Sequence, residues 1–188
     1  SVLYCLWDCA SGKRRVLDEG GLTAVLQGMN AHVRDSAVQR IGFFTLKTLS
    51  CLDNATKQEV LRAGGLTAIV TGMRQHLRNT TLQISGCQAL GVFACPVLED
   101  IEAPGVLEDE LEIAGSEAIL NGGGIAAMIG TMRAHRSNCG VQKACLSVME
   151  FVCRKSIACQ IAVINHCAVI DVVSATKLHP GDDKAASW

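Results

Sequence analysis

The chain has 188 residues, of which 49% are hydrophobic and 4% are aromatic, and its formal net charge is −1. This composition is ample for a core of Leu, Val, Ile, Ala and Cys, and the presence of only three prolines favours an all-helical fold. No apolar run reaches the roughly 18 residues needed to span a bilayer, which excludes a transmembrane segment.

In chain order, the first predicted elements form a unit of one short, one medium and one long helix. Val2–Cys9 has the pattern of the end of a long helix, and Lys13–Glu19 that of a short helix that stops at a glycine pair. Apolar residues at helical spacing predict a medium helix over Leu22–Ala31. Asp35 is a suitable N-cap for the long helix that follows, within residues 35–52. We expect the core stripe of this long helix to consist of Val38, Ile41, Gly42, Thr45, Leu46 and Leu49.

The same order of helices recurs along the chain. The second unit is predicted at Thr56–Arg62, Leu66–Gln75 and Thr80–Cys95, and the third at Asp109–Leu120, Ile125–Ala134 and Val141–Arg154. A fourth begins at Ser156 and reaches only its second helix, near Ala168–Leu178. The predicted organisation is a single domain over residues 1–188, with a partial unit at 1–10, full units at 11–53, 54–95 and 109–154, an acidic insertion at 96–117 and a partial unit at 155–188.

An internal repeat underlies this organisation. Four segments align without gaps, and the differences between their starts are 44, 59 and 44 residues; they begin at Gly20, Gly64, Gly123 and Cys167. Three residue types recur at one register: His32, His76, His135 and His179; Met29, Met73 and Met132; Gln39, Gln83 and Gln142. A repeat of this length indicates stacked units with a continuous core. Because a lone unit cannot bury its apolar face, we expect further repeats or subunits to cover both ends of the chain.

The repeated run resembles the armadillo repeat family. The residues that carry the resemblance are Ala63–His76 (AGGLTAIVTGMRQH), then Gln83, and later Gly123–His135 (GGIAAMIGTMRAH). The resemblance implies an all-α fold in the form of a right-handed superhelical solenoid of three-helix repeats. It also implies that the long helices line a concave groove that binds extended peptides or other proteins.

The groove implied by this resemblance lies on the face of the long helices next to the core stripe. Its predicted residues are Phe44, Lys47, Thr48, Gln88, Val92, Ser147, Glu150, Phe151 and Arg154. In the nuclear-import adaptors of the family, this face carries a Trp and, four residues on, an Asn. The corresponding pairs here are Phe44/Thr48, Gln88/Val92 and Ser147/Phe151, which disfavours the binding of basic nuclear-localisation peptides. The mixed face suits an apolar or helical partner segment, and its two phenylalanines are either interface hot spots or half-buried core.

The segment 96–117 departs from the repeat. It holds eight of the 18 acidic residues and no Lys or Arg, so the rest of the chain is basic. One interpretation is a solvated, mobile loop. The other is a recognition element for a basic partner, or a flap over the basic groove of its own chain, with a short amphipathic helix over Val106–Ala114. The acidic residues concerned are Glu99, Asp100, Glu102, Glu108, Asp109, Glu110 and Glu112. Under the second interpretation, deletion of Leu98–Glu112 weakens binding of the partner in a salt-dependent manner.

The recurring histidines and the ten cysteines are predicted to be structural. Each aligned histidine ends a medium helix, where its imidazole can cap free carbonyls, and residues one repeat apart are too distant to share a metal ion. The cysteines lie mostly in apolar helical patterns and form no C-x-x-C motif, which favours a reducing compartment. A nucleophilic cysteine requires a base beside it, and the sequence around the cysteines contains no local signature of such a pair. The glycines at 122–124 match the glycine pairs of the other units and indicate a turn.

The sequence therefore predicts a non-enzymatic scaffold for protein-protein interaction, as a segment or subunit of a larger assembly. It would bind a protein partner along the groove, through the acidic insertion, or both. Two alternatives are a nuclear-transport-type adaptor and a cysteine-dependent enzyme. No cofactor or metal is expected, and nucleic acid is disfavoured because aromatic stacking side chains are scarce. The expected location is intracellular, with the cytoplasm first and an organelle as the alternative.

Overall fold

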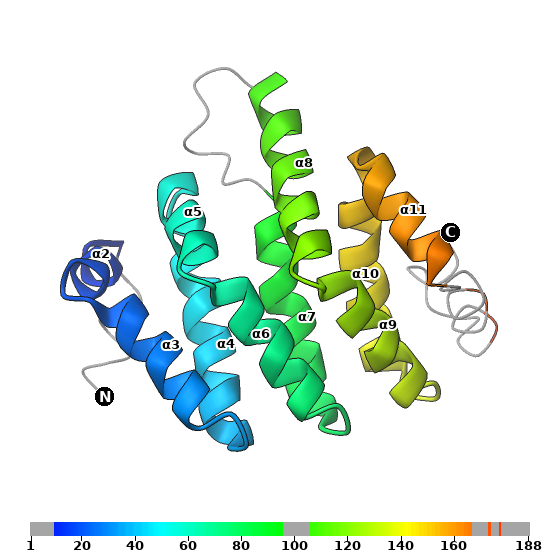
Figure 1. The fold of residues 1–188 in the computed structure, drawn as a ribbon, viewed down its shortest axis with the longest axis horizontal. Coiled ribbons are helices and arrows are strands. Elements are labelled where there is room, and N and C mark those ends of the chain that lie inside the picture. Colours follow the sequence, from blue (N-terminus) through cyan, green and yellow to red (C-terminus); the bar gives the residue numbers. More distant parts are fainter. Residues whose placement is uncertain (1–9, 96–105, 167–172, 174–176, 178–188) are drawn as a thin grey trace.

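A computed structural model describes residues 10–95, 106–166, 173 and 177 of the chain (Figure 1). Within these residues there are ten helices and no strand, so the all-α prediction is confirmed. The short helices are α2 (Ala10–Asp18), α5 (Asn54–Arg62) and α11 (Ile157–Asn165), and α8 (Val106–Asn121) takes the same place in the third unit. The medium helices are α3 (Gly21–Ala31), α6 (Gly65–Gln75) and α9 (Gly124–Ala134). The long helices are α4 (Ser36–Ser50), α7 (Thr80–Ala94) and α10 (Cys139–Lys155).

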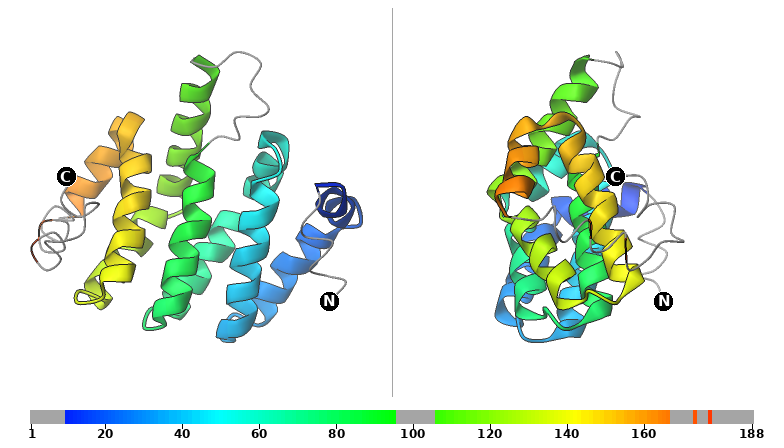
Figure 2. Two further views of the ribbon diagram at one scale, coloured as in Figure 1. Left: turned by 180° about the vertical axis from the view of Figure 1, so that it is seen from behind. Right: turned by 90° about the vertical axis from the view of Figure 1, so that its right-hand side faces the viewer.

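Medium and long helices form two layers. Figure 1 shows α3, α6 and α9 side by side, and the rear view in Figure 2 shows α4, α7 and α10 side by side in the other layer. Each helix packs against the next one of its own layer, and each medium helix also packs against the long helix that follows it. Equivalent positions of successive long helices therefore share one face of the molecule. None of the helices in the described part of the chain has both the length and the apolar character that a membrane span requires.

The predicted starts of the medium and long helices are confirmed to within two residues, and each of these starts has a local cap. Before each long helix, an Asp or Asn side chain accepts hydrogen bonds from backbone N–H groups of the first turn; these residues are Asp35, Asn79 and Asn138. The residue before each medium helix is a glycine whose backbone lies in the left-handed region, which other residues rarely adopt. These glycines are Gly20, Gly64 and Gly123, with φ of 79°, 88° and 74°. Short-range interactions thus place the starts of the medium and long helices within two residues of the sequence prediction, whereas α2 and α8 each begin three residues before the predicted start of the short helix.

The core stripe of α4 differs from the prediction at Ile41, whose side chain is 59% exposed. Val38 is only half-buried, whereas Phe43, outside the predicted stripe, is fully buried. The reason is that α4 packs against both the medium-helix layer and α7, so that its buried side includes Gln39 and Gly42. Apolar spacing does not place a polar residue such as Gln39 on the buried face. The other members of the predicted stripe are buried as expected: Gly42, Thr45, Leu46 and Leu49.

The acidic segment enters the fold through α8. The predicted amphipathic helix over 106–114 and the predicted short helix over 109–120 are one continuous helix of 16 residues. This helix packs against α7, α9, α10 and α11, and its residues Ser116 and Ile119 are buried. The interpretation of the acidic segment as a mobile loop is therefore wrong for residues 106–117.

Some predicted features lie outside the described residues. They are the helix end at 2–9, the residues Glu99, Asp100 and Glu102, and the second helix of the fourth unit near 168–178, apart from Val173 and Lys177, which are helical.

Candidate functional site

One buried glutamine per unit anchors the long-helix layer to the medium-helix layer. In the second unit, Nε2 of Gln83 donates hydrogen bonds to the carbonyl oxygens of Met73 and His76, at 2.8 and 2.9 Å. Gln39 and Gln142 repeat the arrangement in the other two units, at 2.7 to 3.2 Å. The amide thereby binds two carbonyls at the end of the medium helix, of which the one at the histidine also accepts a backbone N–H, as His76 does from Asn79. It also sets the orientation of the long helix, and hence of its exposed face.

The recurring histidines join successive units. Nε2 of His76 lies 2.8 Å from the carbonyl oxygen of Val33, and Nε2 of His135 lies 2.7 Å from that of Leu77. Since a carbonyl can only accept, the imidazole donates through Nε2 in both cases. The carbonyls that these imidazoles bind belong to the turn of the preceding unit, whereas the backbone N–H of each histidine caps its own helix. The fourth aligned histidine, His179, lies outside the described residues.

Two adjoining hollows lie on the long-helix face. The larger, of about 610 Å³, is between α7 and α10, and the smaller, of about 90 Å³, is between α4 and α7. Lys47 and Gln88 line both hollows, which therefore form one continuous surface across the three long helices. We call this surface the track. Most side chains of the larger hollow are apolar or small, such as Ile84, Val148 and Ala144.

The structure brings six of the nine predicted groove residues together on the track. The larger hollow is lined by Lys47, Gln88, Val92, Ser147 and Phe151. The smaller hollow is lined by Phe44, again with Lys47 and Gln88. The residues that line neither hollow are Thr48, Glu150 and Arg154. Thr48 instead donates its hydroxyl to the carbonyl oxygen of Phe44, 2.7 Å away on its own helix.

Two aromatic side chains are exposed on the track. Phe44 on α4 is 52% exposed, and Phe151 on α10 is 37% exposed, so neither ring belongs to the core. The ammonium of Lys47 lies 5.6 Å from the ring centroid of Phe44, and the guanidinium of Arg154 lies 4.6 Å from that of Phe151. A cation over an aromatic face is a favourable contact. Arg154 also lies 3.8 Å from the carboxylate of Glu150.

Sequence reasoning missed several residues of the larger hollow. They are Ile84, Gly140, Lys143, Ala144 and Val148. The small residues among them leave the space between α7 and α10 unfilled, a consequence of helix packing that a single helix does not reveal. The repeat alignment did contain a signal for two of the others. Ile84 and Lys143 occupy the repeat position of Arg40, one helical turn before the predicted row of Phe44, Gln88 and Ser147.

The long-helix layer is basic, although the whole chain is not. Helices α4, α7 and α10 contain five Lys or Arg and one acidic residue, and α7 contains no charged residue. Lys155 is paired with α8, where its ammonium lies 3.3 Å from the carboxylate of Glu112. The other four basic residues are Arg40, Lys47, Lys143 and Arg154. By contrast, α8 has five acidic residues and no basic one, and its described acidic side chains line neither of these two hollows.

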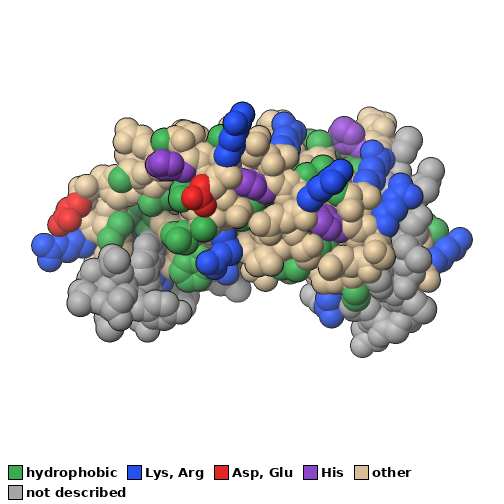
Figure 3. Space-filling view, turned by 90° about the horizontal axis from the view of Figure 1, so that it is seen from below, with side chains coloured by type: hydrophobic (Ala, Val, Ile, Leu, Met, Phe, Trp, Pro, Cys, Tyr) green, Lys and Arg blue, Asp and Glu red, His purple; other side chains and the backbone are tan. Residues whose placement is uncertain are grey.

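A second basic surface lies at the turns between medium and long helices. Figure 3 shows Lys, Arg and His side chains spread along this edge, with few acidic ones among them. The turn sequences account for this, since His76 is followed by Arg78 and His135 by Arg136. The imidazoles of these turns already bond to the neighbouring turn.

Three thiols in the described residues are poorly suited to nucleophilic chemistry. The Sγ atoms of Cys87 and Cys145 lie 3.5 Å apart, and their hydrogen bond, together with burial, raises the pKa of Cys145 well above its ordinary value. Burial raises the pKa of Cys153 to about 11 and also raises that of Cys159. Because the thiolate is the reactive form, these three side chains are unreactive near neutral pH. Within the described part of the chain, no cluster of three or more His, Cys, Asp or Glu side chains could hold a metal ion.

These features define an all-helical protein whose long helices present an apolar track flanked by basic residues. Comparisons of the chain with protein-family models, with curated protein sequences and with solved structures give no significant match. The chemistry of the track itself therefore carries the functional inference.

Proposed function

We propose that this chain is a non-enzymatic scaffold for protein-protein interaction and binds a protein partner along the track of α4, α7 and α10. The observation that supports the proposal is the pair of adjoining hollows, beside which the rings of Phe44 and Phe151 are exposed. Aromatic anchors next to apolar hollows are typical of interface hot spots. A partner that covers them removes apolar surface from water, which is the dominant favourable contribution to most protein association. In this proposal the chain is a segment or subunit of a larger assembly.

We also propose that the units form a right-handed superhelical solenoid of the armadillo type. Two features support this: each described unit uses the same glutamine to join its medium and long helices, and successive units are joined by the same histidine contact. Solenoids are built from units that contact only their neighbours. In the armadillo repeat family, the long helices line the groove that binds partners, which agrees with the position of the track.

The alternative functions have less support. A cysteine-dependent enzyme needs a thiolate, and the raised pKa values of Cys145, Cys153 and Cys159 disfavour that form. A nuclear-transport adaptor of this family would carry Trp and Asn on the long-helix face, and the track has neither. All seven cysteines in the described residues are free thiols, which supports a reducing, intracellular compartment, with the cytoplasm as the simplest choice.

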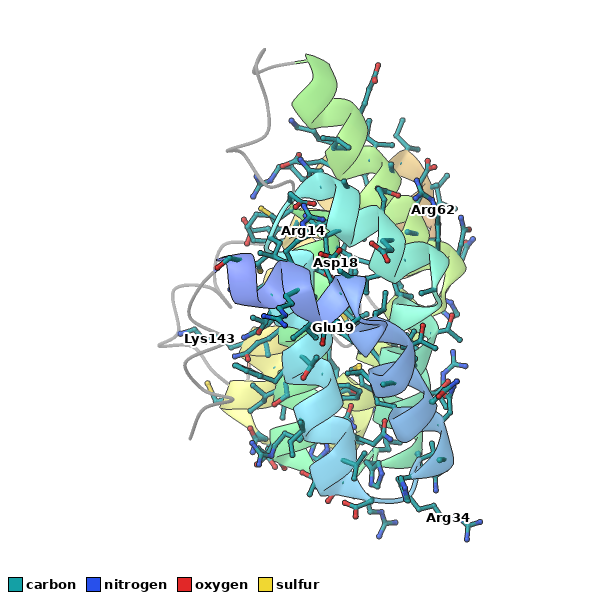
Figure 4. The ribbon with its side chains drawn as sticks, turned by 90° about the vertical axis from the view of Figure 1, so that its left-hand side faces the viewer. Arg14, Asp18, Glu19, Arg34, Arg62 and Lys143 are labelled. Atoms are coloured by element: carbon teal, nitrogen blue, oxygen red, sulfur yellow. The ribbon has the colours of Figure 1, made fainter. Side chains whose placement is uncertain are left out.

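A photo-crosslinking side chain at position 88 tests the proposed function. Gln88 is exposed and lines both hollows, so that a bound partner would lie within reach. Position 62 is the matched control, because Arg62 is exposed on α5 and Figure 4 shows it on the opposite side of the molecule from Lys143, which lines the larger hollow. We expect irradiation in extracts of the native source to attach a discrete protein at position 88 only. Equal attachment at both positions, or none at position 88, would contradict the proposal.

A further inference from the structure

Helix α11, at one end of the array of helices in Figure 1, carries an exposed apolar stripe formed by Ile157, Ile161 and Ile164. We infer that this stripe docks into the larger hollow of a second copy of the chain, between its α7 and α10. The inference rests on the proposed function, because it names a second copy as the partner that occupies the track. It also assigns a role to α11, which is not part of the track.

The stripe faces away from the rest of the fold. The exposed fractions of Ile157, Ile161 and Ile164 are 71%, 51% and 61%. On a helix with about 3.6 residues per turn, these three side chains lie within about 60° of one another, and Cys159 lies on the opposite side. Cys159 is buried, and its thiol donates to the carbonyl oxygen of Ser116 on α8, 3.4 Å away. The side of α11 that contacts α8 is therefore the side without the stripe.

The fold of a unit does not require this stripe. In the repeat register, Ile157 and Ile161 correspond to Asn54 and Gln58 of α5, which are polar. Helix α5 nevertheless packs against α4 and α6 in the place of the short helix. Apolar side chains that gather on one exposed face, without a need in the fold, are typical of a surface that another protein covers.

The larger hollow has the length and the lining to receive this helix. Its lining extends from Ile84 to Cys95 on α7 and from Gly140 to Phe151 on α10. At about 1.5 Å per residue, each side is about 16 Å long, and the stripe is about 10 Å long. Small side chains in the lining, such as Ala144, allow a close approach of helices. An apolar helix face laid into a groove is a common mode of recognition.

The charges of the two surfaces are compatible with this contact. Neither α7 nor α11 contains a charged residue, so the stripe brings no charge into the hollow and meets none on the α7 side. The charged residues that line the hollow are Lys47 and Lys143, whose flexible side chains can keep their ammonium groups in water. A partner segment that carried a charge of its own into the hollow would lose hydration there.

A second copy accounts for two exposed surfaces with one contact. The stripe and the hollow lie on different helices of the same chain, and both present apolar side chains to water. Contact between copies removes both from water, which favours association. Because the two surfaces differ, the contact is heterologous, and two copies either exchange it reciprocally or extend it to a third. One helix in a groove is smaller than a standard interface, so we expect a Kd of about micromolar size.

Analytical ultracentrifugation of the full-length chain tests the inference. Over a dilution series that reaches about 0.1 mM, we expect the native chain to change from monomer to dimer or a larger species. Ile161→Glu places a carboxylate on the stripe and Gln88→Trp fills the hollow, so each should raise Kd by about tenfold or more. The matched controls, expected to associate like the native chain, are Gln58→Glu on α5 and Gln27→Trp on α3. Circular dichroism confirms that each variant keeps its helices.

A mixture of the two variants tests whether the stripe and the hollow meet each other. The Ile161→Glu chain keeps its hollow, and the Gln88→Trp chain keeps its stripe. Equal amounts of the two should therefore associate at a concentration at which each variant alone is monomeric. In the native chain, a photo-crosslinking side chain at position 88 should attach to α11 of the second copy, which mass spectrometry of the crosslinked peptides identifies.

The outcomes separate this inference from the proposed function. A purified chain that stays monomeric throughout the dilution series, while position 88 still crosslinks to a different protein in extracts, would overturn the inference and leave the proposed function in place. Self-association that either Ile161→Glu or Gln88→Trp leaves unchanged would overturn the inference as well. The same applies to a mixture that does not associate, or to attachment at position 88 outside α11. A monomeric chain whose position 88 attaches no protein would contradict both proposals.

Discussion

Nε2 of His135 donates a hydrogen bond of 2.7 Å to the carbonyl oxygen of Leu77, which follows His76 in the preceding unit. His76 makes the same contact with Val33, at 2.8 Å. Each imidazole thus binds the turn of the unit before its own. This shared contact gives His76 and His135 a structural role.

Replacement of His135 by Ala tests that role. We expect the free energy of unfolding to fall by about 0.5–1.5 kcal/mol, the usual net contribution of one hydrogen bond. His32→Ala is the control, since His32 is exposed and lacks such a contact within the described residues, and it should change the free energy by less than about 0.5 kcal/mol. Urea unfolding followed by circular dichroism measures both values. Equal losses for the two variants would rule out the interunit contact as the cause.

Gln83→Ala should be more damaging than either histidine variant. Besides its two bonds to the end of α6, Gln83 accepts a hydrogen bond of 2.6 Å from the hydroxyl of Thr131 on α9. The truncation removes the partner of the buried carbonyl of Met73 and of the buried hydroxyl of Thr131, so a loss of about 2–3 kcal/mol is expected. Gln88→Ala, at an exposed position, should cost less than about 0.5 kcal/mol in the same unfolding assay. Similar losses at 83 and 88 would show that the buried amide does not anchor α7.

Two glycine variants are expected to change thermal stability in opposite directions. A Cβ atom at Gly86 would lie 2.5 Å from Cγ of Met73, so Gly86→Ala forces the core apart and should cost roughly 1–3 kcal/mol. At Gly28, nothing lies within 4 Å of an added Cβ, so Gly28→Ala should raise stability by roughly 0.5–1 kcal/mol through better helix propensity. Calorimetry gives both shifts of Tm. A Gly86→Ala protein as stable as the native chain would contradict this close contact between α6 and α7.

Asp53 should make folding sensitive to acid. Partial burial raises the pKa of its carboxyl, but hydrogen bonds from Thr56 and the guanidinium of Arg14, 2.6 Å away, outweigh burial and hold the pKa below its ordinary value. A group whose folded pKa is depressed contributes stability above its unfolded pKa, about 3.9, and that stability is lost as pH falls through the folded pKa.

Asp53→Ala is therefore expected to lower the free energy of unfolding by about 1 kcal/mol at neutral pH, as loss of an N-cap does. The difference from the native chain should shrink below about pH 4. Asp18→Ala, at an exposed position, should change stability by less than about 0.5 kcal/mol at any pH. Unfolding curves recorded between neutral and acidic pH measure these differences in the free energy of unfolding. If the difference in free energy of unfolding between Asp53→Ala and the native chain stays the same at low pH, the charge of Asp53 is not its source.

Thiol labelling should follow exposure. Among the cysteines that the structure describes, we expect the exposed ones to react first with iodoacetamide at neutral pH; these are Cys51, Cys95 and Cys139. We expect the cysteines with a raised pKa to react last, because so little of each is present as thiolate. These are Cys145, Cys153 and Cys159. Mass spectrometry of labelled peptides gives the order. Rapid labelling of any of the last three would restore a cysteine-dependent enzyme as a serious alternative.

The structure also changes how the acidic segment is best tested. Deletion of Leu98–Glu112 would remove the first part of α8 together with the ion pair between Glu112 and Lys155. A loss of binding could then follow from a disrupted fold. A deletion that ends before Val106 leaves α8 and this ion pair in place. Unchanged binding by that shorter deletion would assign the residues before α8 to a spacer.

Local patterns predicted the helices well and their partners poorly. Asp35 and Gly64 mark helix boundaries because a cap or a left-handed turn depends on a few neighbouring residues. Ile41 was misplaced because its helix is covered on two sides, and the apolar spacing was consistent with more than one buried face. The row of groove residues was identified by its repeat register, but the volume between α7 and α10 was not.

The sequence by itself determined an all-helical chain, its repeated order of short, medium and long helices, and the residues that cap them, since all of these depend on interactions within a few residues. Only the tertiary structure decided that the imidazole of His135 reaches Leu77 in the preceding unit. It alone also showed that Gly91 and Ala144 line one hollow. Both features arise where helices of different units meet, and packing between distant segments leaves no periodic pattern in either segment alone.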